Sequence, residues 1–489
     1  MCPQKFAHNI LDVGSVPLAA GWRNSSESNL IFILILLLIL LTTSEKGVGQ
    51  ETRLVHSSPD YLSFVQTPSA LTLEDCLSIG LQKNRELNQS RSRVSVAQAK
   101  KRQLVASQLP KASVQIQESL YGTAAAPTAK DQQELFRLGI SATIEPFGRF
   151  KSLKRSSEAQ IQVAEAERSS AEIETAFQVT RAFYDLLLSK HLEKVASDSV
   201  DQLQLHRDHT ARLVETGAVP GFDLLRAEVQ LSSAKPALIR ASHAISTDQA
   251  DLLHLLGIDP TATPQIIGSF SESIPDSIPI KEEEAVHLAF QQRPDLRAAK
   301  ALLDSAAHAL KATQQALQPS IQLTHLLDRS RGSQQPVDSY SDNRTTQLGL
   351  NIPVFDTGLT RAQTKEAAAN LHTTRLSYES TVSQAYVEIR KSVSDLSEAS
   401  EVVVSQEKNV EQAREALTIA ESGYQTGAKT SLDVLDAQLA LTQAKTLWYQ
   451  SLRDRTVALA RLEKALGFMP GYFRNSSSIS TTAASHIVH

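Results

Sequence analysis

The first half of the chain passes through four successive patterns of apolar and polar positions. From about Glu74 to Leu109 the apolar residues recur at helical spacing, and Pro110 then ends the helix and favours an extended backbone. Two runs of strict alternation follow, separated by a loop of small residues, and helical spacing resumes after Gly148. These patterns predict a helix, a β-hairpin over residues 111–146, a long helix over 148–215 and a shorter helix over 222–256.

The long runs of helical spacing contain no proline. In the second of them Val382, Tyr386 and Ile389 follow one another at intervals of four and three, which is typical of helices that pack as coiled coils. About 67 residues at 1.5 Å each make a helix of about 100 Å. The returning helix is only about half as long. We therefore expect it to stack end to end with the helix before Pro110, so that the two short helices pack along the long one.

The second half of the chain repeats the first. Pro110 corresponds to Pro319 at an offset of 209 residues, and the tripeptide Thr-Gly-Ala recurs at an offset of 210. A period this long exceeds the roughly 20 to 50 residues of solenoid repeats, so we interpret it as one structural half present twice. The first repeat is predicted over residues 71–270 and the second over 280–470, with a β-hairpin over 320–355, a long helix over 358–425 and a shorter helix over 432–466.

The two ends of the chain differ from the repeats. Leu30 to Leu41 is an unbroken run of twelve apolar residues, and we interpret residues 1–49 as a signal peptide. The alternative is a membrane anchor, but twelve helical residues extend only about 18 Å, against roughly 30 Å of hydrocarbon. Residues 50–70 are predicted to be a linker. Residues 471–489 are rich in Ser and Thr and are predicted to be a disordered tail.

The four alternating runs suit strands of a membrane protein, although soluble hairpins with one buried face give the same pattern. No segment after the signal peptide has the 18 or more apolar residues of a membrane-spanning helix, so any crossing must use strands. In lipid the edges of a sheet must be paired, because each unpaired backbone group costs several kcal/mol. Four strands cannot close a barrel. Chains must then associate, with eight strands in a dimer or twelve in a trimer.

Composition and motifs exclude several classes of protein. The chain has 49 Lys and Arg against 53 Asp and Glu, so nothing indicates binding to nucleic acid. Its two cysteines, Cys2 and Cys76, exclude a disulfide framework, and we expect Cys76 to be a buried apolar residue. Phosphate-loop, nucleophile-elbow and zinc-protease motifs are absent, so neither an enzyme nor a cofactor is expected. His206 and His209 could bind a metal, but we favour a solvated helix face.

The order of elements and one turn motif resemble the TolC family of outer-membrane efflux and secretion channels. The motif is Thr-Gly-Ala-x4-Asp-x-Leu-x-Ala, and its most specific copy lies within residues 423–437. The resemblance implies a mostly α-helical fold with membrane β-strands: a coiled-coil α-helical barrel in the periplasm, continuous with a twelve-stranded β-barrel in the outer membrane. It also implies a homotrimer to which each chain contributes four strands.

The same resemblance implies a function in export. The channel would dock, through a periplasmic adaptor (membrane-fusion) protein, to an inner-membrane pump of the RND or ABC type, which supplies the energy. An alternative within this class is the outer-membrane component of a type I protein-secretion system. A more distant alternative is a periplasmic coiled-coil scaffold without a channel, although a scaffold has no need of the four alternating runs.

The resemblance also assigns roles to residues in the turns between long and short helices. Asp433 and Asp436 match the acidic constriction of the pore, while Tyr424, Lys429 and Asp223 match residues that latch the closed tube. The alternative for Asp433 is helix capping, since it follows Thr430 at the spacing of a capping box. The expected docking surface for the adaptor consists of the two turn tripeptides Thr216, Gly217, Ala218 and Thr426, Gly427, Ala428.

Overall fold

The computed structural model describes residues 70–123, 126–259, 261–270, 282–331 and 340–475. The chain divides into two units, Met1–Phe64 and Val65–His489, and all described residues belong to the second. The predicted signal peptide over 1–49 and all of the predicted linker except its last residue lie outside the described residues.

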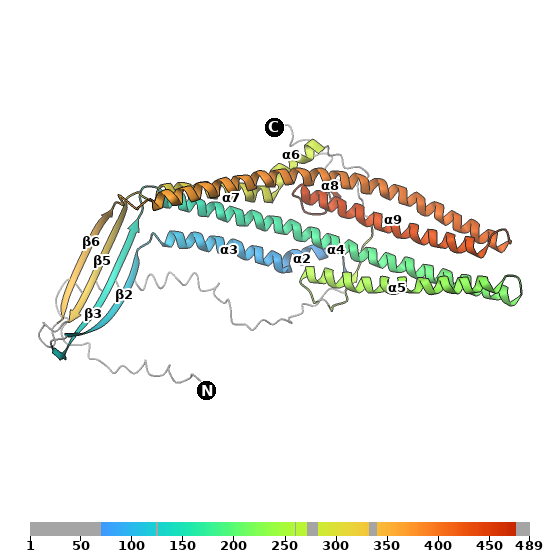
Figure 1. Ribbon diagram of the computed structural model, residues 1–489, viewed down its shortest axis with the longest axis horizontal. Helices are drawn as coiled ribbons and strands as arrows, with labels where there is room; N and C mark the ends of the chain where they lie inside the picture. The colour runs from blue at the N-terminus through green and yellow to red at the C-terminus, as the bar shows by residue number, and fades with distance from the viewer. Residues whose placement is uncertain (1–69, 124–125, 260, 271–281, 332–339, 476–489) are drawn as a thin grey trace. The chain divides into compact units, whose positions relative to one another are not determined.

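Each half contains the same succession of elements (Figure 1). The first half consists of β1 (Ala70–Leu71), α2 (Leu73–Lys83), α3 (Arg85–Ala106), β2 (Lys111–Thr123), β3 (Ala126–Ile144), α4 (Arg149–Glu215) and α5 (Gly221–Leu256). The second half consists of β4 (Gln265–Ile266), α6 (Glu282–Gln292), α7 (Pro294–Gln314), β5 (Ser320–Arg331), β6 (Ser341–Asn351), α8 (Leu359–Gln425) and α9 (Ser431–Ala465), followed by α10 (Tyr472–Asn475).

The prediction of one unbroken helix before Pro110 is wrong, because the helix breaks at Asn84. The backbone of Asn84 leaves the helical region with a ψ of 131°, and its side chain accepts a hydrogen bond from Leu87 N, which caps α3. The second half breaks at the equivalent position, where Arg293 precedes Pro294 at the start of α7. In each half, the polar residue at the break also bonds the returning helix of the same half.

These breaks let the short helices stack end to end. Asn84 Nδ2 donates to Leu255 O at 2.9 Å, and Arg293 Nη1 donates to Ala465 O at 2.9 Å, so each breaking residue bonds the carboxyl end of the returning helix. Gly257 has a φ of 67°, and a Cβ there would lie 2.8 Å from Lys83 O. Both α3 and α5 contact α4, which confirms the predicted stacking of two short helices along one long helix.

The long helix α4 lies at the centre of the helical layer. It contacts α3 and α5 on one side and α7 and α9 on the other, while α8 packs outside α7 and α9 (Figure 1). Its middle carries the largest apolar cluster, in which Phe183 and Leu186 pack against Leu252 and Cys76. Cys76 is fully buried, as the sequence predicted. The layer therefore ends in α8 on one side and in α3 with α5 on the other.

The four long strands form one antiparallel sheet in the order β2-β3-β5-β6. The two predicted hairpins are joined by pairing between β3 and β5, in which Ile144 lies opposite Ile321. The strands β2 and β6 each pair on one side only within the described chain. The sheet therefore has two open edges, and each edge continues directly into one border of the helical layer.

One face of this sheet is exposed and is apolar in the part next to the helical layer, whereas farther away it carries Arg329, Asp342 and Arg344. Ile116 is 79 % exposed and Leu348 is 74 % exposed, and Leu138 and Leu323 share their face. The opposite face is polar: a row across the sheet consists of Gln115, Arg137, Asp328 and Asn343. Within that row Arg137 Nε lies 2.6 Å from Asp328 Oδ1. The predicted alternation of the strands is confirmed.

The prediction of a disordered tail is wrong for residues 471–475, and residues 476–489 lie outside the described residues. Residues 471–475 are ordered and include α10, because Gly471 N and Phe473 N donate to the carboxylate of Glu463 at 2.7 and 2.8 Å. Glu463 is 1 % exposed, and a buried carboxylate requires such donors. In the part of the chain that the structure describes, no helix has both the length and the apolar composition needed to span a membrane.

Candidate functional site

The turns that join each long helix to its returning helix have the same backbone. In the second turn Ala428 N donates to Gly423 O at 2.8 Å and Gly427 N donates to Tyr424 O at 3.1 Å, which is a Schellman motif. In the first turn Ala218 N and Gly217 N make the equivalent bonds to Leu213 O and Val214 O. Gly427 and Gly217 both have positive φ angles, of 77° and 71°, which explains the repeated glycine.

The tripeptides predicted to dock the adaptor lie at these turns and are exposed. They consist of Thr216, Gly217, Ala218 in the first turn and Thr426, Gly427, Ala428 in the second. A Cβ added at Gly217 or Gly427 would meet no atom within 4 Å, so the space beside each turn is open.

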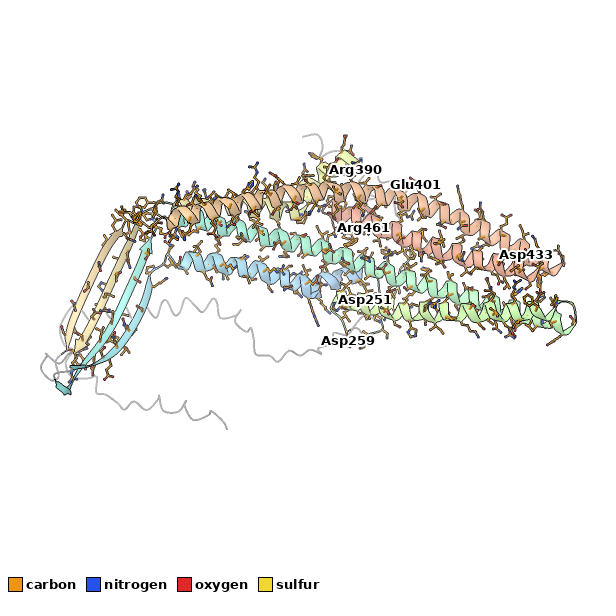
Figure 2. All side chains as sticks on the ribbon, in the orientation of Figure 1. Asp251, Asp259, Arg390, Glu401, Asp433 and Arg461 are labelled. Carbon is orange, nitrogen blue, oxygen red and sulfur yellow. The ribbon has the colours of Figure 1, made fainter. Side chains whose placement is uncertain are left out.

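Asp433 lies near the start of α9 (Figure 2), where its carboxylate closes a capping box. Its Oδ2 accepts hydrogen bonds from Thr430 N at 2.7 Å and Thr430 Oγ1 at 2.8 Å, and Asp433 N donates to Thr430 Oγ1 at 3.3 Å. The hydrogen bonds from Thr430 lower the pKa of Asp433, and the charge of Lys429 acts in the same direction. Capping therefore keeps this carboxylate ionised.

Asp436 differs from Asp433 although it lies only one helical turn away. Its side chain is exposed, and it makes no hydrogen bond or ion pair within the described chain. Asp223, the equivalent of Asp433 in the first half, makes no capping bond either, because Pro220 occupies the N-cap of α5. Of these three predicted carboxylates, helix capping accounts for Asp433 alone.

Lys429, a predicted latch residue, is exposed and folds back over its own turn. A Cβ at Gly423 would lie 2.4 Å from Lys429 Cγ, so the glycine makes room for the lysine side chain. Within the described residues no carboxylate lies at ion-pair distance from Lys429, and its role as a latch stays a prediction.

Tyr424, another predicted latch residue, contacts two histidines of the first hairpin. Its ring centroid lies 5.6 Å from that of His206 and 6.0 Å from that of His209. His206 Nε2 is 2.9 Å from Ser431 Oγ, the first residue of α9. His206 is 8 % exposed and Ser431 is 3 % exposed. The interpretation of His206 as part of a solvated helix face is therefore wrong.

His206 lies on the buried face of α4, in line with Leu203 and Thr210 at intervals of three and four. Leu203 packs against Leu231 of α5 and Leu435 of α9, so an apolar contact between the hairpins flanks the histidine. Burial, with a smaller contribution from the positive charge of His209, lowers the pKa of His206, while the charge of Asp223 acts in the opposite direction. The histidine is thus held in its neutral form where the two hairpins meet.

A resident metal has no support at this site. Within the described ranges, no group of three or more His, Cys, Asp or Glu side chains is arranged to hold a metal ion. The described residues of the site offer hydrogen bonds, ring contacts and exposed carboxylates.

The long helical hairpins continue into an antiparallel sheet whose side chains alternate between an apolar and a polar face, as in the strands of outer-membrane proteins. A sequence model of this class, described as "Outer membrane efflux protein", matches residues 77–258 and again residues 285–468. The chain belongs to the outer membrane efflux protein family, and the resemblance to TolC-like channels is confirmed. It is therefore a component of the cell outer membrane that extends into the periplasm.

Individual relatives agree with this assignment. The pyoverdine export outer membrane protein OpmQ of Pseudomonas aeruginosa is 26% identical over 362 residues, which cover 72% of this chain and 74% of OpmQ. The probable efflux pump outer membrane protein TtgC of Pseudomonas putida is 25% identical over 336 residues, 68% of each chain. The open-state structure of the MtrE outer membrane channel of Neisseria gonorrhoeae is 21% identical, with a TM-score of 0.71 over 81% of this chain and 89% of that one. This structural similarity concerns the fold.

Proposed function

We propose that this protein is the trimeric exit duct of a tripartite efflux pump and exports small molecules across the outer membrane. The observation that carries the proposal is the four-stranded sheet, which has two open edges and one exposed face that is apolar next to the helical layer. A periplasmic coiled-coil scaffold has no use for such a sheet. The duct needs no chemistry of its own, because an inner-membrane pump of the RND or ABC type supplies the energy through a periplasmic adaptor protein.

The open edges favour closure by further copies of the chain. The strands β2 and β6 run in opposite directions, since every neighbouring pair in the sheet is antiparallel. The β6 edge of one copy can therefore pair antiparallel with the β2 edge of the next. Eight strands give a barrel filled by its own side chains, whereas twelve strands enclose a wider lumen lined by the polar face. Transport through the lumen thus favours three copies over two.

The internal repeat predicts the register of this pairing. An offset of 209 residues relates β2 to β5 and an offset of 210 relates β3 to β6, and these offsets convert the β2–β3 register into the β5–β6 register. Val114 opposite Leu138, for example, becomes Leu323 opposite Leu348. Applied to the pairing of Ile140 with His325, the same offsets place Leu350 opposite Ile116 of the neighbouring copy.

The borders of the helical layer support the same assembly. The outer surface of α8 exposes apolar side chains along its length, and α5 does so at the opposite border. These exposed residues are Leu376, Val387, Val404 and Ile419 on α8, and Leu225, Val229 and Ile239 on α5. Copies that extend the sheet at each of its two edges would cover both borders, which removes apolar surface from water.

The turns supply the periplasmic functions of the proposed duct. Three copies would arrange Asp436 and Asp433 as two acidic rings that attract cations. Asp436 is the stronger candidate for the pore, because its carboxylate is exposed and does not cap the helix. The two exposed turn tripeptides are proposed to dock the adaptor.

Cysteine crosslinking between neighbouring copies tests the proposal. In Ile116→Cys/Leu350→Cys, oxidation of the isolated outer membrane should link chains into covalent dimers and trimers. The matched control is Ile116→Cys/Thr346→Cys, which displaces one cysteine by four residues, about 13 Å, on the same face. Burial raises the pKa of the native Cys76 thiol to about 12, so this residue does not interfere. Equal crosslinking of both pairs, or recovery of a soluble monomer, would contradict the proposal.

A further inference from the structure

Two hairpins, α4–α5 and α8–α9, meet near their turns through a small set of buried contacts. His206 of α4 bonds Ser431 of α9, and its ring lies against Tyr424 of α8. Both bonded side chains are more than nine-tenths buried. The apolar cluster around Leu203 and Leu435 and the ring contact between Tyr424 and His209 also join the hairpins at this level. The imidazole of His206 therefore lies within the contact that joins the two hairpins near their turns.

The hydroxyl of Tyr424 makes this contact easy to open. Its oxygen is buried, and it has no hydrogen-bond partner within the described part of the chain. A buried hydroxyl without a partner raises the free energy of the closed arrangement, and the hydroxyl regains hydrogen bonds with water when the hairpins part. The closed state is thus stabilised by the His206–Ser431 bond and weakened by Tyr424.

We infer that His206 is a proton-sensitive latch: the turns stay together while it is neutral and separate when it takes up a proton. The titratable groups that face it are His209 on its own helix, Asp223 of α5 and Tyr424 of α8, while α9 presents the hydroxyl of Ser431. An imidazolium in this position would be buried beside a second histidine. Of the charged groups that act on it, Asp223 would favour the imidazolium and His209 would oppose it.

The direction of the pH effect follows from the two states. In the closed state, burial lowers the pKa of His206 below its ordinary value of 6.5. In the open state the side chain is exposed and its pKa returns to that value. The closed state is therefore fully stabilised above pH 6.5 and loses this stabilisation as the pH falls toward the closed-state pKa. Each unit of difference between the two pKa values shifts the equilibrium by at most about tenfold per chain.

The distance between the two turns can be measured directly. Ala218→Cys and Ala428→Cys place spin labels at two exposed positions, one on each turn. Labelled chains diluted in unlabelled chains report the distance within one chain. Between pH 7.5 and 5.5 we expect the population at long distance to rise severalfold, with a midpoint below 6.5. A parent protein without this response would overturn the inference.

Three variants separate the latch from general effects of acid. His206→Gln retains a hydrogen-bonding group for Ser431 but does not titrate, so its distances should not change with pH. The control is His243→Gln, an exposed histidine of α5 whose replacement should leave the response of the parent intact. Ser431→Ala should show long distances already at pH 7.5. An unchanged acid response in His206→Gln would overturn the inference.

The consequence for transport rests on the proposed channel, but the separation of the turns does not. If the turns respond to acid while the protein forms no pores in planar bilayers, the proposed function fails and the latch stands. If pores form and the turns ignore pH, the latch alone fails. If both hold, acid on the periplasmic side should raise the open probability of the parent severalfold and leave His206→Gln unchanged.

Discussion

The two helical hairpins have the same backbone and different side-chain environments. Both long helices have 67 residues and end in the same glycine turn. In the first hairpin α4 is covered on both sides, whereas in the second α8 leaves Val387 and Ile419 exposed, at 63 % and 58 %. The second hairpin also has a capping box at Thr430, where the first has Pro220. The two copies of the repeat therefore share the backbone geometry of the turn but differ in the side chains around it.

This divergence is strongest in charge. Two turns of α9 present Asp433 and then Asp436, whereas the equivalent positions of α5 carry Asp223 and Arg226. Arg226 lies over the ring of Phe222, with its guanidinium carbon 5.6 Å from the ring centroid. Of the two returning helices, only α9 therefore presents two carboxylates on one face at these equivalent positions beside its turn. We therefore assign the proposed acidic constriction to the second hairpin.

Substitutions at the junctions between the short helices are expected to show the largest difference between the halves, in the free energy of unfolding. Arg293 is buried and bonds Ala465 O, Asp295 and Glu388, whereas its equivalent Asn84 bonds Leu255 O and caps α3. Arg293→Ala should lower the free energy of unfolding by about 3 kcal/mol, because charged partners lose their cation. Asn84→Ala should cost about 1 kcal/mol. Urea titration of the detergent-solubilised protein, followed by circular dichroism, measures both; equal losses would contradict this difference.

A smaller effect, on block of the pore by cations, should distinguish the carboxylates of the two turns. Asp436→Asn should raise the concentration of a trivalent cation that half-blocks the pore by roughly tenfold, because it removes an exposed ring of charge. Asp433→Asn should change block less, since that carboxylate is engaged with Thr430. Asp223→Asn is the matched control in the first hairpin. Planar-bilayer currents measure the block; no change in Asp436→Asn would remove this residue from the constriction.

The smallest effect concerns the shared glycine and should be equal in both turns. A Cβ at Gly217 or Gly427 meets no neighbour, so alanine at either position costs only the left-handed backbone, about 1 kcal/mol. Hydrogen exchange of the last helical turn before each glycine measures local opening. If alanine increased the exchange rate clearly more in one turn than in the other, the two backbones would not be equivalent.

The sequence predicts the helices and strands well because their signals are local. Gly148 and Gly358 precede the two long helices with φ angles of 103° and 88°, as the ends of the alternating runs suggested. The break at Asn84 had a local signal that was missed, since Asn84 caps α3 and Pro294 begins α7 at the equivalent break. What no local pattern indicates is the bond from Asn84 to Leu255, 171 residues further along the chain. Pairing of β3 with β5 is likewise a contact between repeats, which no periodicity within one strand can indicate.

The site was predicted in part for the same reason. The turn motif located both tips, and the spacing of Thr430 and Asp433 indicated the capping box that the structure shows. The burial of His206 was missed because its partners, Tyr424 and Ser431, lie on the other hairpin, more than 200 residues away. The spacing of His206 from Leu203 and Thr210 was the available signal, since all three share one face of α4.

Closure of the sheet by neighbouring copies is the step on which the duct depends. A structure of the intact assembly in lipid, determined by electron cryomicroscopy, would give the distance between Leu350 Cα and the Ile116 Cα of the adjacent copy. We expect three copies and a separation of about 5 Å, as for directly opposed residues of antiparallel strands. A solitary chain, or edges β2 and β6 covered by segments of their own chain, would contradict the proposed barrel.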